Sequence, residues 1–296
     1  MPDAKLPPRL GIVILLAIAT TFGANHVAAR FAFDHGTSVA AAVSTRSAVT
    51  ALVLLMLMRI QGVSLGLPHA THARALFVGL LVAIQSFCLY SAVARIPAAL
   101  ALLVFQTCPM LFVLLSWATG KEKPRQSALL AMPLALAGLA LALDVRLDHL
   151  AGRWAEIGAG VSWAFGAALS FTLVFFFNAH WLKTLDGRLR AFVTMAVTAT
   201  VVLAGGAAAD VLALPVDAKG WLGLALLTLL YGAAITSLFI VLPRLDGAAS
   251  TVALNFEPIA VLGLAWVVLG QSVTPLQTVG AFLVVGAIAW LGAAKH

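Results

Sequence analysis

The sequence predicts an all-α integral membrane protein with ten transmembrane helices, arranged as two inverted five-helix repeats around a central cavity. The 296 residues are 62% hydrophobic and 10% charged, with a mean hydropathy of +1.05. A soluble domain is about half apolar and about a quarter charged, so lipid must solvate much of this chain. The second half also repeats landmarks of the first at a constant spacing of 149 positions: Arg95, Pro109 and Trp117 recur as Arg244, Pro258 and Trp266.

Ten apolar stretches are long enough to cross a bilayer, which takes about 20 apolar residues each. They cover 9–29, 38–59, 73–94, 98–117, 127–143, 155–178, 190–212, 219–243, 248–269 and 275–294. Turn residues separate them, as in Gly66-Leu67-Pro68. The polar connection 144–154 joins the halves, so we expect a first repeat at 1–148 and a second at 149–296.

Basic residues in the loops predict the orientation, because Lys and Arg concentrate on the cytoplasmic side. With the N-terminus inside, the inner segments hold twelve Lys and Arg residues and the outer loops hold five. Both termini should therefore be cytoplasmic. Five helices per repeat is an odd number, so the second repeat must be inverted relative to the first. The expected location is the cell inner membrane, as a multi-pass protein.

Several function classes have no support in the chain. The net charge of +7 comes from basic residues scattered singly between apolar segments, which does not indicate nucleic-acid binding. Cys88 and Cys108 lie inside apolar segments, so a secreted disulfide framework is not expected. Phosphate-loop, zinc-helix and serine-hydrolase motifs are absent. We therefore expect no enzyme activity, no cofactor and no metal, and the sequence leaves the oligomeric state open.

The paired prolines are the strongest repeat-related signal for a site. A proline inside a helix leaves the carbonyl four residues earlier without its usual donor, and here those carbonyls belong to Phe105 and Leu254. Such breaks are tolerated in a membrane where neighbouring groups or water bind the backbone. We predict that Pro109 and Pro258 act as hinges beside a cavity, with a static packing kink as the alternative.

Polar and aromatic residues at mid-depth are the candidate cavity lining. Gln106 and Asn255 occupy equivalent repeat positions, and Glu257 lies about 200° from Asn255 on a continuous helix, so the two should face different ways. The predicted substrate-binding residues are Phe22, Asn25, Gln85, Gln106, Trp163, Tyr231 and Asn255. The secondary candidates are His26, Ser86, Tyr90 and Glu257.

For some of these candidates the sequence leaves more than one role open. Glu257 could contact a substrate amine or carry a proton, or it could be a carboxyl held by hydrogen bonds between helices. His26 could carry a proton. The aromatic residues could simply pack. Arg46, in contrast, is expected to be an anchor at the membrane interface.

The whole chain resembles the drug/metabolite transporter superfamily of the EamA type. The resemblance rests on the ten spans, on the prolines of the fourth and ninth spans, and on the segments Asn255-Phe256-Glu257-Pro258, Gly270-Gln271-Ser272 and Gln277-Thr278-Val279-Gly280. It departs at Gln271, where the family often has Glu. Among such proteins the chain is most similar to YddG-type exporters of aromatic and other neutral amino acids. The resemblance implies a cavity lined by the first, third, fourth, sixth, eighth and ninth spans.

The predicted function is export of small neutral or zwitterionic metabolites, with amino acids as the favoured substrates, by alternating access. Few charges lie within the spans, which argues against a multiply charged substrate. Other small metabolites or drugs are the alternative. From other classes, an integral-membrane enzyme would need clustered His, Asp or Glu, and a non-transporting membrane subunit would not need the internal duplication.

Overall fold

The computed structural model describes residues 7–67, 69–120, 126–142, 150–182, 185–241, 256–272 and 274–293, which form α-helices and no strand. The helices of the first half are α1 (Pro8–Asp34), α2 (Val39–Ile60), α3 (His69–Val93), α4 (Ala98–Phe105), α5 (Cys108–Ala118) and α6 (Gln126–Ala142). Those of the second half are α7 (Leu150–Trp181), α8 (Gly187–Ala208), α9 (Ala218–Val241), α11 (Glu257–Leu269) and α12 (Pro275–Ala293).

The helices have the length and composition of a membrane bundle. Seven described segments are long and apolar enough to cross a bilayer: 10–34, 39–60, 71–93, 98–118, 157–178, 187–208 and 218–238. Three shorter apolar helices cover 129–142, 257–269 and 275–287. Large apolar side chains face outward, as with Ile60 (83% exposed) and Val267 (72%). Small residues such as Ala29 and Ala32 (both 0%) fill the interior, where they let helices approach closely.

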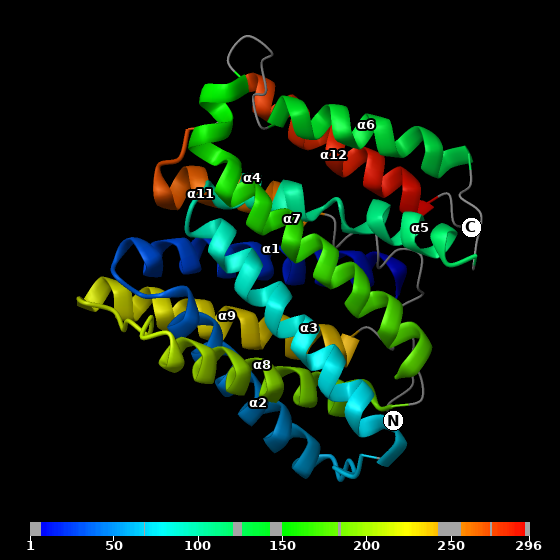
Figure 1. Cartoon of the computed structure of the whole chain (residues 1–296), viewed down its shortest axis with the longest axis vertical. Coiled ribbons are helices and arrows are strands. Elements are labelled where there is room, and N and C mark those ends of the chain that lie inside the picture. Colours follow the sequence, from blue (N-terminus) through cyan, green and yellow to red (C-terminus); the bar gives the residue numbers. More distant parts are fainter. Residues whose placement is uncertain are drawn as a thin grey trace.

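Helix packing follows the same plan in the two halves (Figure 1). The helix α1 packs on α9, and its counterpart α7 packs on α3. In the same way α2 packs on α9, and its counterpart α8 packs on α3. Finally, α1 packs on α11, and its counterpart α7 packs on α5. Two further pairs, α2 with α8 and α6 with α12, join each helix to its own counterpart. This exchange of partners is typical of two repeats related by a pseudo-two-fold axis, although the junction at 148 and 149 lies outside the described residues.

The fourth predicted span is broken, which differs from the single helix expected over 98–117. The helix α4 ends at Phe105, a turn follows at Gln106 and Thr107, and α5 begins at Cys108. Pro109 therefore lies in the first turn of a new helix, where its missing N–H costs nothing. The Thr107 hydroxyl donates to the Val104 carbonyl at 2.9 Å and satisfies one acceptor at the end of α4.

The second half begins a helix at the equivalent residue. Glu257 opens α11, 149 positions after Cys108 opens α5, and Pro258 follows it as Pro109 does. The residues before these helices, Thr107 and Phe256, have closely similar backbone angles (φ −68°, ψ −14° and φ −72°, ψ −18°). Pro109 thus lies in the first turn of α5 and not in the middle of a continuous helix. The residues before Phe256 lie outside the described part of the chain, so the predicted angle between Asn255 and Glu257 stays a prediction.

Loops also differ from the predicted boundaries at one end of the bundle. The helix α1 continues to Asp34, and an ion pair between Arg30 Nε and Asp34 Oδ1 at 3.0 Å spans its last turn. The helix α8 ends at Ala208, and the segment after it crosses to the turn between α1 and α2. There Ser38 receives the Ala213 N–H on its hydroxyl at 3.0 Å and donates its own N–H to the Ala213 carbonyl at 2.9 Å.

Candidate functional site

A group of polar side chains lies in the interior where α1, α2, α3, α9 and α11 meet. We call it the polar centre, and it consists of Asn25, His26, Arg46, Tyr90, Tyr231 and Glu257. The first half supplies α1, α2 and α3, and the second half supplies α9 and α11. The polar centre is therefore built at the contact between the halves, where sites of transporters with repeated halves are found.

Asn25 connects three helices of the polar centre. It is 0% exposed. Its Nδ2 donates to the Leu227 carbonyl of α9 at 2.6 Å, and its Oδ1 accepts from the Tyr90 hydroxyl of α3 at 2.5 Å. A buried amide needs such partners, because an unpaired polar group in an apolar interior costs free energy. These bonds set the distance between α1, α3 and α9.

Arg46 is the buried cation of the polar centre. Its side chain belongs to α2 and is only 2% exposed. The guanidinium carbon lies 3.8 Å from the centre of the Tyr231 ring and 4.5 Å from that of Tyr90, one ring from each half of the chain. Its Nε and Nη1 have no hydrogen-bond partner in the described part of the structure. The expectation of an interfacial anchor is wrong, because the side chain turns into the bundle and away from the lipid.

His26 and Glu257 form a pair between α1 and α11. The His26 Nε2 lies 3.2 Å from Glu257 Oε1, and the two side chains are 8% and 27% exposed. Glu257 occupies the first turn of α11, where backbone N–H groups and the helix dipole favour a carboxylate. The His26 ring also lies 5.5 Å from the ring of Tyr90, so this pair borders one of the two tyrosines that cover Arg46.

Aromatic rings extend the polar centre along α1 and α9. Phe22 meets Tyr231 edge to face with 6.0 Å between ring centres. The Tyr231 hydroxyl contacts the sulfur of Met195 on α8 at 3.7 Å. Phe22 and Tyr231, both predicted cavity residues, are thus brought to the same place as Asn25.

The other predicted site residues lie in separate surroundings. Gln85 and Ser86 are buried next to each other on α3, where the Ser86 hydroxyl donates to Gln85 Oε1 at 3.3 Å. Trp163 of α7 packs on Phe87, with ring centres 5.9 Å apart. The guanidinium carbon of Arg95 lies 5.6 Å from the centre of the Trp163 ring. Within the described residues, these contacts place Trp163 beside the end of α3.

Gln106 lies at the break of the fourth span. Its side chain is half-buried, and its backbone N–H donates to the Leu102 carbonyl at 2.9 Å. Its predicted partner Asn255 lies outside the described residues, so the pairing of these two amides stays a prediction. The predicted hinges Pro109 and Pro258 stand directly after the two equivalent turns.

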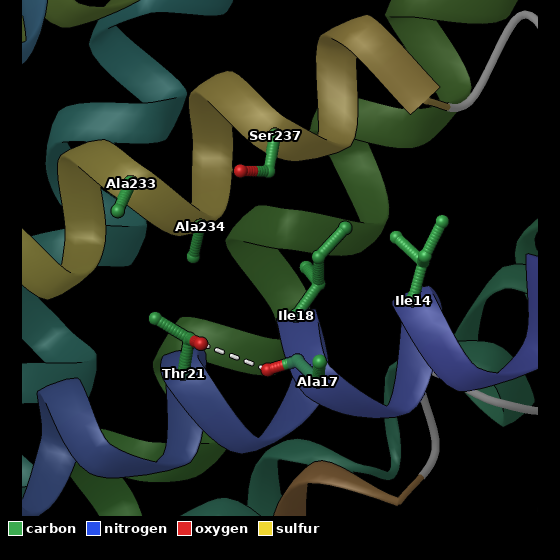
Figure 2. A pocket seen from close by; sticks show the side chains of 7 residues that line it. All are labelled: Ile14, Ala17, Ile18, Thr21, Ala233, Ala234 and Ser237. Atoms are coloured by element: carbon green, nitrogen blue, oxygen red, sulfur yellow. Dashed lines mark hydrogen bonds between the residues drawn. The ribbon is translucent and has the colours of Figure 1, made fainter.

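A cavity of about 320 Å³ opens between α1 and α9 (Figure 2). Its lining is apolar apart from two hydroxyls, and consists of Ile14, Ala17, Ile18, Thr21, Ala233, Ala234 and Ser237. The Thr21 hydroxyl donates to the Ala17 carbonyl at 2.8 Å. Thr21 directly precedes Phe22, and Ala234 follows Tyr231 by about one helical turn, so the cavity continues along the same two helices.

Sequence reasoning missed Arg46 as a site residue. The available signal was its position: it is the one basic residue that falls in neither an inner nor an outer loop. A charge inside a span is a functional candidate by default. Metal binding finds no donor set in the described ranges, where no three His, Cys, Asp or Glu side chains gather.

The long apolar helices, with a polar centre between two like halves, define the class of the chain as a multi-pass helical membrane protein. Residues 9–143 and 158–293 each match the EamA-like transporter family, to which the chain therefore belongs. Members of this family are membrane transporters of small molecules.

A further comparison, with solved structures and curated proteins, supports the fold and gives no relative whose activity is described. A solved structure described as "Crystal structure of protein" aligns over 98% of each chain with a TM-score of 0.67 and 19% sequence identity. At this identity the likeness shows a shared fold alone. No curated protein matches the chain.

Proposed function

We propose that this transporter exports small neutral or zwitterionic metabolites from the cytoplasm, with aromatic and other neutral amino acids as the main substrate class. One observation carries the proposal: the polar centre contains one cationic and one acidic side chain, Arg46 and Glu257, at the contact between the halves. A solute with one positive and one negative group has matching charge. A multiply charged solute would need more buried charges of one sign.

The route follows from the two halves. Residues 1–148 and 149–296 act as inverted five-helix repeats in the inner membrane, with both termini in the cytoplasm. Rocking of one repeat against the other exposes the polar centre to each side in turn. The turns before α5 and α11 are the hinges, with Pro109 and Pro258 limiting where each helix begins.

The substrate-facing residues are proposed in two groups. Those in or beside the polar centre contact the solute. The main ones are Phe22, Asn25 and Tyr231, and the secondary ones are His26, Tyr90 and Glu257. Those on the broken span and its neighbours line the path, and they are Gln85, Ser86, Gln106, Trp163 and Asn255.

A second candidate function is export of amphiphilic metabolites or drugs. The cavity between α1 and α9 favours it, because that cavity is apolar apart from the hydroxyls of Thr21 and Ser237. A mostly apolar lining with a few polar groups suits an amphiphilic molecule. The two candidates differ in whether a charged head group is required for transport.

Export is tested in two preparations. Purified protein in liposomes should exchange labelled L-phenylalanine and L-leucine across the membrane, and intact cells loaded with phenylalanine-containing dipeptides should release free phenylalanine faster when they express the protein. Gln106→Ala and Asn255→Ala should each slow transport about tenfold while expression is unchanged, as expected for loss of one polar contact of about 1.4 kcal/mol. Movement of cationic dyes with none of either amino acid would replace the amino-acid proposal by the drug alternative.

A further inference from the structure

Arg46 lies well inside the apolar bundle. It comes seven residues after Val39, the first residue of α2, which is about 10 Å along the axis at 1.5 Å per residue. A charged side chain at such depth costs a few kcal/mol unless other groups compensate it. The rings of Tyr90 and Tyr231 supply part of that compensation through cation–π contacts.

The rings leave two of the nitrogen donors of Arg46, Nε and Nη1, without an acceptor. A guanidinium has five N–H donors in a planar fork, and ring faces accept none of them in the plane. Nε and Nη1 are buried without a hydrogen-bond partner in the described residues. A buried donor without an acceptor is destabilising, and such donors are rare in proteins. We therefore expect Arg46 to find an acceptor in another state of the protein.

Most polar groups near Arg46 have contacts of their own, and His26 Nδ1 is buried without a hydrogen-bond partner in the described residues. The Tyr90 hydroxyl donates to Asn25, the Tyr231 hydroxyl contacts Met195, and the Glu257 carboxylate lies against His26. None of these groups accepts a hydrogen bond from Arg46 Nε or Nη1 in this structure. The geometry points to the carboxylate of the transported solute, which the planar fork of Arg46 binds through two parallel hydrogen bonds. This inference rests on the proposed transport function and narrows its substrate class to solutes with a free carboxylate.

The closed surroundings of Arg46 explain why each half supplies one ring. Tyr90 belongs to α3 of the first half and Tyr231 to α9 of the second. Both rings cover the guanidinium here, and a change in the distance between α3 and α9 uncovers its edge. Movement of one half against the other thus opens the carboxylate site, while the rings hold the cation when the site is empty.

The test compares ligands that keep or lack the carboxylate, together with one that lacks only the amine. Exchange of labelled L-phenylalanine in liposomes is competed with L-phenylalanine, L-phenylalaninamide, phenethylamine and 3-phenylpropanoate, and a parallel series uses L-leucine and L-leucinamide. With wild-type protein, the amides and the amine should compete at least tenfold more weakly than the amino acids. In Arg46→Gln, phenylalanine exchange should fall about a hundredfold and the ratio between acid and amide should approach one.

Arg95→Gln is the matched control. Arg95 also stacks on an aromatic ring, that of Trp163, but it is exposed and its Nη1 donates to the Ser91 carbonyl at 2.8 Å. This variant should keep the wild-type ratio between acid and amide. Where Arg46→Gln does not give a monodisperse protein, Arg46→Lys keeps the charge without the fork and should reduce the ratio to an intermediate value.

A binding measurement separates this inference from the transport proposal. The melting temperature of detergent-purified wild-type protein should rise with 3-phenylpropanoate and not with phenethylamine, and Arg46→Gln should lose the rise. Binding of this kind without any exchange in liposomes would reject amino-acid transport and keep the carboxylate site. Equal competition by acid and amide in wild type, or an unchanged ratio in Arg46→Gln, would overturn the inference.

Discussion

In the pair of α6 and α12, two helices touch backbone to backbone at Gly138 and Gly280, whereas in the polar centre five helices meet through amide, aromatic and charged side chains. Figure 1 shows the pair lying beside the rest of the bundle, on the side away from α2 and α8. The first region has little room between the two backbones. The second contains polar and charged groups from both halves, so we expect substitutions in the pair to affect stability and substitutions in the polar centre to affect transport.

The largest effect is predicted for Gly280→Val. A Cβ at this position would lie 2.5 Å from the Gly138 carbonyl oxygen and in overlap with the Ala142 backbone nitrogen. Backbone atoms cannot move aside as a side chain could, so we expect a loss of about 3 kcal/mol or more, or failure to fold. Gly286→Val, on the same helix with open space around it, should express like wild type. Yield and melting temperature in detergent measure both, and equal behaviour of the two variants would contradict the close contact.

Asn25→Ala should come next, and it should reduce both stability and transport. The change leaves the Leu227 carbonyl and the Tyr90 hydroxyl without their hydrogen-bond partner in the interior. Two such losses in a buried setting amount to about 2–4 kcal/mol. The melting temperature and amino-acid exchange in liposomes should fall together. A variant that melts lower yet exchanges at the wild-type rate would show that Asn25 only holds α1, α3 and α9 in place.

Tyr90→Phe separates the hydroxyl of Tyr90 from its ring. The variant removes the hydrogen bond to Asn25 and retains the ring at the Arg46 guanidinium. We expect a loss of about 1 kcal/mol in stability and an unchanged preference for the acid over the amide. Tyr231→Leu, which removes a ring from the guanidinium, is the contrasting change and should weaken that preference. The competition series used for Arg46 measures both variants.

Periodic apolar segments were enough to predict the helical membrane fold, because a span needs length and composition more than specific contacts. The paired prolines marked the place of the helix breaks, but not that α4 ends and a new helix starts, since Pro109 fits equally in the first turn of a helix.

Contacts across the chain were beyond prediction from one sequence. His26 and Glu257 are 231 positions apart, and only packing of α1 on α11 brings them within 3.2 Å. Arg46 illustrates the same limit, because its position in the chain shows the depth of a charge but not whether the side chain faces lipid or the interior. Local signals place residues along a helix, and the packing of helices decides which face is buried.

The smallest effect on stability is expected at Asp217, which is exposed at the end of the bundle, unlike the buried charges of the polar centre. The backbone N–H of Gly220 and the His35 ring hold the pKa of Asp217 below its usual range, with hydrogen bonds of 2.7 and 2.9 Å to its carboxylate. Because the pKa is lower in the folded state, the stabilisation is present above about pH 4, the pKa of a free Asp, and is lost as the pH falls through the folded value. Asp217→Asn keeps an acceptor for Gly220, removes the charge and replaces the oxygen that faces His35 with an NH2 group. The melting temperature of wild type should therefore exceed that of Asp217→Asn slightly at pH 6, and the difference should vanish by pH 3. A difference that persists at pH 3 would mean that the carboxylate charge is not what fastens this loop to α1.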